Sequence, residues 1–289
     1  MSKRVLQRLA MSICFMLCVL FLGQVTVFAD EVKPTWTELA SMFNSRYFFQ
    51  TEVVNNNIYA IGGINNGVTK DTTEVYDTST NQWTTLAHMS TARYEFQTEV
   101  IDGKIYVMGG RTEKLITYST EVYDPDTNKW KTLAAMCNER TNFQTEVING
   151  KIYAMGGITN NGRTNTMEVY DPVANKWTIL ASMSKAKNGF QTEVINDKIY
   201  SIGNAYSDSN RTTEVYDPVT NQWTTLAPLY IGRGEFRTEV INGKIYAMGG
   251  TGKTDDGGIL KITEVYDPAT NQIDSRIYLS ETENVFCFL

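Results

Sequence analysis

The sequence contains a single histidine, His88, among its 289 residues. Nucleophilic triads and many catalytic metal sites depend on histidine side chains, so one histidine argues against both kinds of site. The adjacent acids Asp255 and Asp256 supply too few oxygen atoms for a calcium ion. We therefore predict no catalytic residue, no metal and no cofactor.

Long hydrophobic runs are also few, and the one that is present lies at the N-terminus. Three basic residues precede an apolar run over residues 9–22, and Ala29 ends a Val-Phe-Ala sequence suited to signal cleavage. We predict cleavage after Ala29 and a secreted, extracellular protein with no membrane attachment. An uncleaved anchor is the alternative, because residues 9–29 are about long enough to span a bilayer.

Cysteine and positive charge are both scarce in the predicted mature chain. Of four cysteines only Cys137 and Cys287 would remain, which excludes a disulfide framework and leaves their pairing open. The signal segment holds three of the 26 basic residues and none of the 32 acids, so the mature charge is 23 minus 32, or −9. Nucleic-acid binding needs clustered basic side chains, so nucleic acid is excluded as a partner.

What the sequence does contain is a repeat. The steps between successive tryptophans are 47, 47, 47 and 46 residues, at Trp36, Trp83, Trp130, Trp177 and Trp223. Diglycines keep the same step at 62–63, 109–110, 156–157 and 249–250, with Gly203-Asn204 at the remaining position. A fixed period of this length indicates a repeat architecture of packed supersecondary units.

The third unit, residues 143–180, shows what each repeat encodes. It has four short runs of β-branched and aromatic residues separated by turn residues, which predicts four strands. Asn149-Gly150 can take the positive φ angles of a tight type I′ hairpin. Asp171-Pro172 ends the third run, because proline cannot pair in a ladder. Such a small sheet cannot bury both faces alone, so the units must pack against one another.

The diglycine after strand two, Tyr170 in strand three and Trp177 in strand four make the unit similar to the kelch repeat, and the resemblance covers residues 36 to about 272. It implies an all-β fold, a β-propeller of four-stranded antiparallel blades over residues 30–272, followed by an atypical tail at 273–289. Five sets of strands predict five blades. The fifth set has Ile273 in place of tryptophan, so we expect residues 34–41 to supply its outer strand and close the ring. A truncated larger ring is the alternative.

Variation between the units is confined to one rim of the predicted propeller. The connections from strand two to three and from strand four to the next strand one share this rim. The variable stretches are residues 64–72, 111–119, 158–166, 204–212 and 251–262. Rigid scaffolds carry binding residues on such loops, so this rim is the candidate recognition face, with drift of unconstrained loops as the alternative. Residues 250–254 are similar to a phosphate loop, but the first glycine and the following helix are missing.

Charged residues recur beside these loops and along strand one. The cations that precede strand one are Arg46, Arg93, Arg140, Lys187 and Arg233. The strand-one carboxylates are Glu52, Glu99, Glu146, Glu193 and Glu239, each two positions after a glutamine except the last, which follows Arg237. Alternation along a strand places these positions on one face near the axis. In one interpretation each glutamate pairs with arginine or backbone of a neighbouring blade; in the other they line a channel that binds a cation or a sugar.

We predict a non-catalytic extracellular binding module that holds a protein or glycan ligand on the variable rim. The candidate binding residues are the recurring arginines, the strand-one glutamates and Arg237. The alternative is a sugar-acting enzyme, because some exported bacterial kelch propellers that this chain resembles isomerise sialic acid with channel Glu and Arg side chains. A third hypothesis is an oligomerising surface-layer component, and the sequence does not decide the oligomeric state.

Overall fold

The computed structural model describes residues 36–204, 211–252 and 258–274. The chain divides into two units, Met1–Leu39 and Ala40–Leu289, and all described strands belong to the second. Within the described ranges there is no helix that is long and apolar enough to cross a membrane. The predicted signal segment, Cys287 and the pair Asp255 and Asp256 lie outside the described residues.

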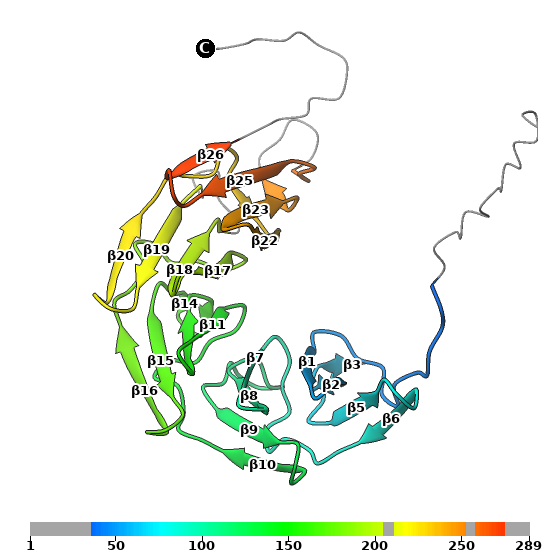
Figure 1. The fold of residues 1–289 in the computed structure, drawn as a ribbon. Helices are drawn as coiled ribbons and strands as arrows, with labels where there is room; N and C mark the ends of the chain where they lie inside the picture. The colour runs from blue at the N-terminus through cyan, green and yellow to red at the C-terminus, as the bar shows by residue number, and fades with distance from the viewer. Residues whose placement is uncertain (1–35, 205–210, 253–257, 275–289) are drawn as a thin grey trace, which may run out of the picture. The chain divides into compact units, whose positions relative to one another are not determined.

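Five four-stranded antiparallel sheets follow one another along the second unit (Figure 1). Sheet 1 contains β1 (Gln50–Val54), β2 (Asn57–Ile61), β5 (Thr73–Asp77) and β6 (Gln82–Thr85). Sheet 2 contains β7 (Gln97–Ile101), β8 (Lys104–Met108), β9 (Thr120–Asp124) and β10 (Lys129–Thr132). Sheet 3 contains β11 (Gln144–Ile148), β12 (Lys151–Met155), β15 (Met167–Asp171) and β16 (Lys176–Leu180). Sheet 4 contains β17 (Gln191–Ile195), β18 (Lys198–Ile202), β19 (Thr213–Asp217) and β20 (Gln222–Thr225). Sheet 5 contains β22 (Arg237–Ile241), β23 (Lys244–Met248), β25 (Thr263–Asp267) and β26 (Gln272–Asp274).

Short two-residue strands pair within or beside the variable loops of sheets 1, 3 and 5. They are β3 (Ile64–Asn65) with β4 (Val68–Thr69), β13 (Ile158–Thr159) with β14 (Gly162–Arg163), and β21 (Arg233–Gly234) with β24 (Thr251–Gly252). Isolated bridges also join Tyr94 to Arg111 and Thr141 to Ile158. Each of these bridges links a four-to-one connection to a two-to-three loop, which confirms that both kinds of connection share one rim.

The turns predicted from sequence have the expected backbone. Asn149 and Gly150 adopt φ angles of 50° and 69°, and Asp102 and Gly103 adopt 49° and 73°. These positive values belong to the type I′ hairpins that asparagine, aspartate and glycine favour. The turn residues therefore explain why strands one and two of each sheet meet in a fixed register.

The outer strand of sheet 5 corrects one prediction. It is β26, which pairs with β25 so that Ile273 lies opposite Tyr266. The same register places Trp223 opposite Tyr216 in sheet 4. Ile273 thus occupies the tryptophan position, and the expectation that residues 34–41 supply this strand is wrong; residues 36–41 form no strand. Backbone pairing alone completes the sheet, and it does not require the tryptophan. β26 also runs past the predicted end of the repeat domain at residue 272.

Successive sheets pack face to face through apolar side chains. The innermost strands lie next to one another from sheet to sheet, β1 beside β7, β7 beside β11, β11 beside β17 and β17 beside β22. Between sheets 2 and 3, for example, Met108 of one sheet and Phe143 and Ile152 of the next are fully buried in one cluster. The repeat therefore buries each sheet against its copies, as a propeller requires.

In sheets 1, 2 and 4 the periodic tryptophan attaches the sheet to the chain segment that enters it. In sheet 2 the Asn128 side-chain oxygen accepts hydrogen bonds from the Tyr123 hydroxyl and the Ala87 amide, both at 2.9 Å. The Trp130 indole donates to the Ala87 carbonyl, also at 2.9 Å. Ala87 of the incoming segment is thus held by two side chains of the sheet that follows it, and Tyr123 fixes the position of one of them, Asn128.

Candidate functional site

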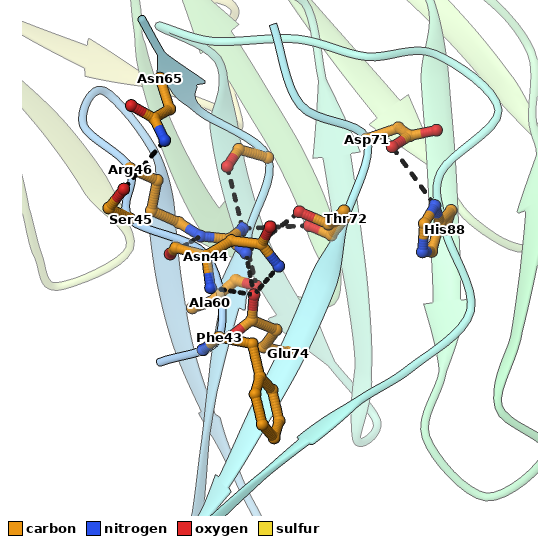
Figure 2. A network of polar contacts seen from close by, with 11 residues as sticks. Phe43, Asn44, Ser45, Arg46, Ala60, Asn65, Asp71, Thr72, Glu74 and His88 are labelled. Atoms are coloured by element: carbon orange, nitrogen blue, oxygen red, sulfur yellow. Dashed lines mark hydrogen bonds and ion pairs between the residues drawn. The ribbon is translucent and has the colours of Figure 1, made fainter. Parts of the chain in front are cut away.

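The recurring arginines form buried ion pairs inside the fold, as Arg46 illustrates (Figure 2). Its guanidinium lies 2.6 Å from Glu74 and also donates to the carbonyls of Gly62 and Thr72. Both charged side chains are fully buried. Glu74 also accepts hydrogen bonds from the backbone amides of Phe43 and Asn44. The ion pair therefore fastens the incoming segment to strands two and three of its own sheet.

The same pairing recurs in three further sheets. The pairs are Arg93–Glu121, Arg140–Glu168 and Arg233–Glu264, each with side chains at most 2% exposed. The glutamate in each pair lies on strand three, so the interpretation that arginine pairs with a strand-one glutamate is wrong. The strand-three carboxylate is preferred because it lies within reach of the arginine and of the incoming backbone amides together. The four guanidinium groups are occupied in this way, and the ligand role predicted for them stays a prediction.

Lys187 holds the corresponding place in sheet 4 with weaker contacts. Its amine reaches the Ser201 hydroxyl at 3.1 Å and lies 3.4 Å from the Thr212 carbonyl. Desolvation lowers the pKa of Lys187 to about 8, although the charge of Glu214 opposes this shift. Arginine presents five N–H donors in a fixed plane, whereas lysine has only three donors on one nitrogen. Lys187 therefore cannot reproduce the full set of contacts.

The strand-one glutamates interact with the following sheet. Glu52 accepts a hydrogen bond from Thr98, Glu99 from Thr145, Glu146 from Thr192 and Glu193 from Thr238. Neighbouring carboxylates lie close enough to raise one another's pKa. The prediction that these side chains gather on one face near the axis is consistent with this coupling.

Burial makes two of these carboxyl groups titrate near neutrality. The pKa of Glu99 is raised to about 7, mainly by desolvation. The hydrogen bond from Thr145 lowers this pKa, and the charges of Glu146 and Glu52 raise it. Desolvation likewise raises the pKa of Glu146 to about 7. Each is partly exposed. These groups can therefore hold or release a proton at neutral pH.

The glutamines two positions earlier also contact the next sheet. Gln50, Gln97 and Gln144 donate to the carbonyls of Phe96, Phe143 and Phe190 at 2.6–2.8 Å. Arg237, which replaces glutamine in sheet 5, is exposed and donates to the carbonyl of its own neighbour, Phe236. The strand-one glutamines and glutamates therefore both form contacts between sheets. Arg237 differs from the glutamines because it bonds within its own sheet.

A cluster of aromatic and charged side chains on the variable rim was not singled out by the repeat pattern. We call Tyr47, Phe48, Tyr94, Glu95 and Arg111 the rim cluster. Tyr47 and Phe48 are 52% and 57% exposed, and the Phe48 ring stacks on Tyr94 with centroids 6.4 Å apart. Beside them the Arg111 guanidinium donates to the Glu95 carboxylate at 3.1 Å. Aromatic faces and a charged pair thus share one exposed area.

The backbone of the rim cluster is held in an unusual conformation. Phe48 and Glu95 have φ angles of 55° and 52°, a region that residues other than glycine and asparagine rarely enter. The Glu95 amide donates to the Phe48 carbonyl at 3.1 Å. Asn142 takes the same conformation at the corresponding place in sheet 3. Gly189 and Glu235 take it in sheets 4 and 5, so this conformation belongs to the repeat. The exposed side chains, and not the backbone, make the rim cluster the best candidate site.

His88 lies on the surface. It is about half exposed and its Nδ1 atom lies 3.3 Å from Asp71 (Figure 2). Within the described ranges no group of three or more histidine, cysteine or carboxylate side chains is placed to hold a metal. Cys137 is exposed and forms no disulfide with any described residue.

Comparison with known families agrees with this architecture. The model of the KLHDC2/KLHL20/DRC7 Kelch-repeats domain matches residues 48–250, and the Kelch motif matches residues 232–272. The chain belongs to the kelch-repeat family. A solved structure described as "Structure of YjhT" is similar in fold, with a TM-score of 0.67 at 18% identity, over 85% of this chain and 88% of that chain. No curated protein matches the sequence.

Membership in the kelch family accounts for the buried positions. The diglycines, the tyrosine–asparagine–tryptophan contacts and the arginine–glutamate pairs recur from sheet to sheet, and they hold the blades together. The Phe48–Tyr94 stack and the Arg111–Glu95 pair have no counterpart elsewhere in the described sheets, and neither does Arg237. A kelch scaffold does not by itself specify a ligand, so function is argued below from these non-repeated residues.

Proposed function

We propose that this kelch propeller is a non-catalytic binding module that takes up a carbohydrate at the rim cluster. The observation that carries the proposal is the exposed stack of Phe48 on Tyr94 beside the Arg111–Glu95 pair. A pyranose ring has a face of C–H groups that packs on aromatic rings and a periphery of hydroxyls that bond to carboxylate and guanidinium. The rim cluster presents both kinds of partner side by side.

The geometry of the rim supports a preformed site. Glu95 is bonded to Arg111 on one side and accepts a hydrogen bond from the Thr141 hydroxyl at 3.2 Å on the other. The backbone bond from Glu95 to Phe48 joins sheets 1 and 2 at this point. A site whose side chains are already fixed loses less conformational entropy when it binds. The secreted location predicted from residues 1–29 would expose this rim to extracellular glycans and stays a prediction.

The test is a glycan array, followed by calorimetry with a sugar that binds. Phe48→Asn removes the ring and keeps a residue that tolerates positive φ, as Asn142 does at the matching position. We expect this variant to lose binding by about tenfold or more, which corresponds to roughly 1.4 kcal/mol. Tyr230→Ala is the control, because Tyr230 is 54% exposed and lies outside the cluster. An array without any hit, or binding that Phe48→Asn leaves intact, contradicts the proposal.

A second candidate function is a sugar-acting enzyme that uses the strand-one carboxyl groups. It is favoured by one observation, the pKa values of about 7 for Glu99 and Glu146. A carboxyl group with such a pKa can act as acid or base at neutral pH. Turnover of a sugar by the native chain, lost in a folded Glu146→Gln variant, would overturn the non-catalytic proposal.

A further inference from the structure

Each sheet has two faces that play different parts in packing. The forward face packs on the next sheet along the chain; in sheet 2 it carries Gln97, Glu99 and Ile101 of β7. The backward face packs on the preceding sheet and carries Thr98 and Val100 of the same strand. Four interfaces between sheets pair a forward face with a backward face, from sheet 1 to sheet 5.

The four interfaces are built from the same contacts. The first glycine of each diglycine position receives a phenylalanine ring of the next sheet, as in Gly62 with Phe96 and Gly109 with Phe143, where an added Cβ would stand 2.8 Å from the ring. Next to this contact the glutamine of the forward face donates to the carbonyl of that phenylalanine. The strand-one glutamate accepts from a threonine of the backward face.

The forward face of sheet 5 carries the same kinds of side chain, but none of the described sheets packs on it. Ile241 is 54% exposed and Met248 38% exposed, whereas their counterparts in sheet 3 are buried. Arg237 and Glu239 are exposed as well. No phenylalanine ring of the described residues lies beside Gly249, where the nearest atom to an added Cβ is the Leu260 carbonyl oxygen at 3.5 Å.

The backward face of sheet 1 is also uncovered by any described sheet, and it is the type of face that packs on a forward face at the four interfaces. Val53 is 65% exposed and Thr51 is exposed. Phe49 is partly exposed, although the corresponding phenylalanines of sheets 2 to 5 are buried. Among the described strands, β1 and β22 make no contact as extensive as those between successive inner strands. The first sheet of the same chain therefore does not cover sheet 5.

We propose that the forward face of sheet 5 binds the backward face of sheet 1 of a second copy of this chain, head to tail. The Phe49 ring of the second copy enters the space beside Gly249, and its Thr51 hydroxyl donates to Glu239. Arg237 donates to the Phe49 carbonyl, as glutamine does to the phenylalanine carbonyl at the first three interfaces. The contact continues an interface that this fold already builds four times.

The proposed contact is heterologous, because the two surfaces that meet are different. A second copy that binds through its sheet 1 leaves its own sheet 5 free, so association continues until it closes or forms longer assemblies. Two exposed apolar faces on one chain are otherwise a liability for a soluble protein. This inference is independent of the carbohydrate site, which lies on a different set of side chains.

Sedimentation of the full chain over a range of concentrations tests the proposal. We expect the mass to rise with concentration, and Ile241→Glu or Val53→Glu to weaken association by about tenfold or more. Both side chains are exposed, so circular dichroism and the unfolding midpoint should stay unchanged. Val173→Glu is the control, because Val173 is 99% exposed on a turn away from both faces.

Mixing the two variants gives the sharpest result. Ile241→Glu keeps an intact sheet 1 face and Val53→Glu an intact sheet 5 face, so an equimolar mixture should form a dimer that cannot grow further. A wild-type chain that stays monomeric overturns the proposal, and so does association that neither substitution weakens. A monomer whose radius of gyration increases in Val53→Glu would assign the fifth-sheet face to the first sheet of the same chain instead, and would also overturn it.

Discussion

Sheets 3 and 5 share almost the same strands but differ in how deeply these strands are buried. β12 and β23 have identical sequences, Lys-Ile-Tyr-Ala-Met. Met155, which ends β12, is fully buried, whereas Met248, which ends β23, is 38% exposed. The pattern of one strand therefore does not decide its burial. The neighbouring sheet does, and predictions about stability have to name that neighbour.

The largest expected difference in stability is between variants of the buried Arg140 and of the exposed Arg237. Arg140→Met leaves the buried Glu168 carboxylate without its partner, so we expect the free energy of unfolding to fall by about 3–5 kcal/mol. Arg237→Met removes an exposed side chain of sheet 5 and should change it by less than about 0.5 kcal/mol. Urea unfolding followed by circular dichroism measures both. An equal loss of stability in the two variants would contradict the stabilising role assigned to the Arg140–Glu168 pair.

The paired methionines test the burial difference directly. Met155→Ala opens a cavity in a closed interface and should cost about 2–4 kcal/mol. Met248→Ala should cost less than about 1 kcal/mol when the protein is dilute enough to be monomeric. A large cost for Met248→Ala under those conditions would show that another part of the same chain covers sheet 5.

The half-buried Glu146 of sheet 3 should make the free energy of unfolding depend on pH. The folded pKa of Glu146 is about 7, above its ordinary value, so the fold favours the protonated form. This stabilisation is fully present below the unfolded pKa of 4.5 and is lost as the pH rises through about 7. Glu146→Gln cannot ionise, and should raise the free energy of unfolding at pH 8 by roughly 1–2 kcal/mol and change it little at pH 4.

Unfolding of this variant at both pH values measures the difference. The exposed Glu113→Gln serves as the control and should show no such dependence. A destabilised Glu146→Gln at every pH would mean that the hydrogen bond from Thr192 outweighs the desolvation of the carboxylate.

The smallest expected effect concerns the missing tryptophan of sheet 5. A small apolar pocket lies between sheets 4 and 5, lined in part by Ile202, Leu229 and Ile273. Ile273→Trp would fill it, and its indole would meet the Ala227 carbonyl as Trp223 meets Ala181 at 2.9 Å. We expect stabilisation by about 1 kcal/mol, measured as a higher urea midpoint. A lower midpoint would indicate that the pocket cannot admit the larger ring.

Much of the scaffold could be predicted from the sequence because its determinants are local and repeated. The Asn149-Gly150 hairpin and the strand breaks at Asp171-Pro172 depend on backbone preferences that a single residue pair carries. The outer strand of sheet 5 was assigned wrongly for the opposite reason. The prediction took tryptophan as the mark of strand four, but the strand pairs through its backbone, and Ile273 satisfies the same register.

The candidate site was harder to predict for two physical reasons. Glutamates recur on both strand one and strand three, and periodicity cannot show which of them lies within reach of Arg140; only the folded geometry selects Glu168. The Phe48–Tyr94 stack and the Arg111–Glu95 pair occur once among the described sheets, so a search for regularity passes over them. Nothing in the identity of Phe48 signals a positive φ angle, which comes from the surrounding connections.

The contact of Ala87 with sheet 2 has a consequence for how such a protein can grow. Because Asn128 and Trp130 hold the segment that enters their own sheet, a self-contained module begins at that segment and not at the first strand. Residues 87–133 form one such module, and a duplication with these ends would carry its own attachment point with it. Gene duplication in steps of one module could therefore lengthen the array without new contacts having to evolve at the junctions.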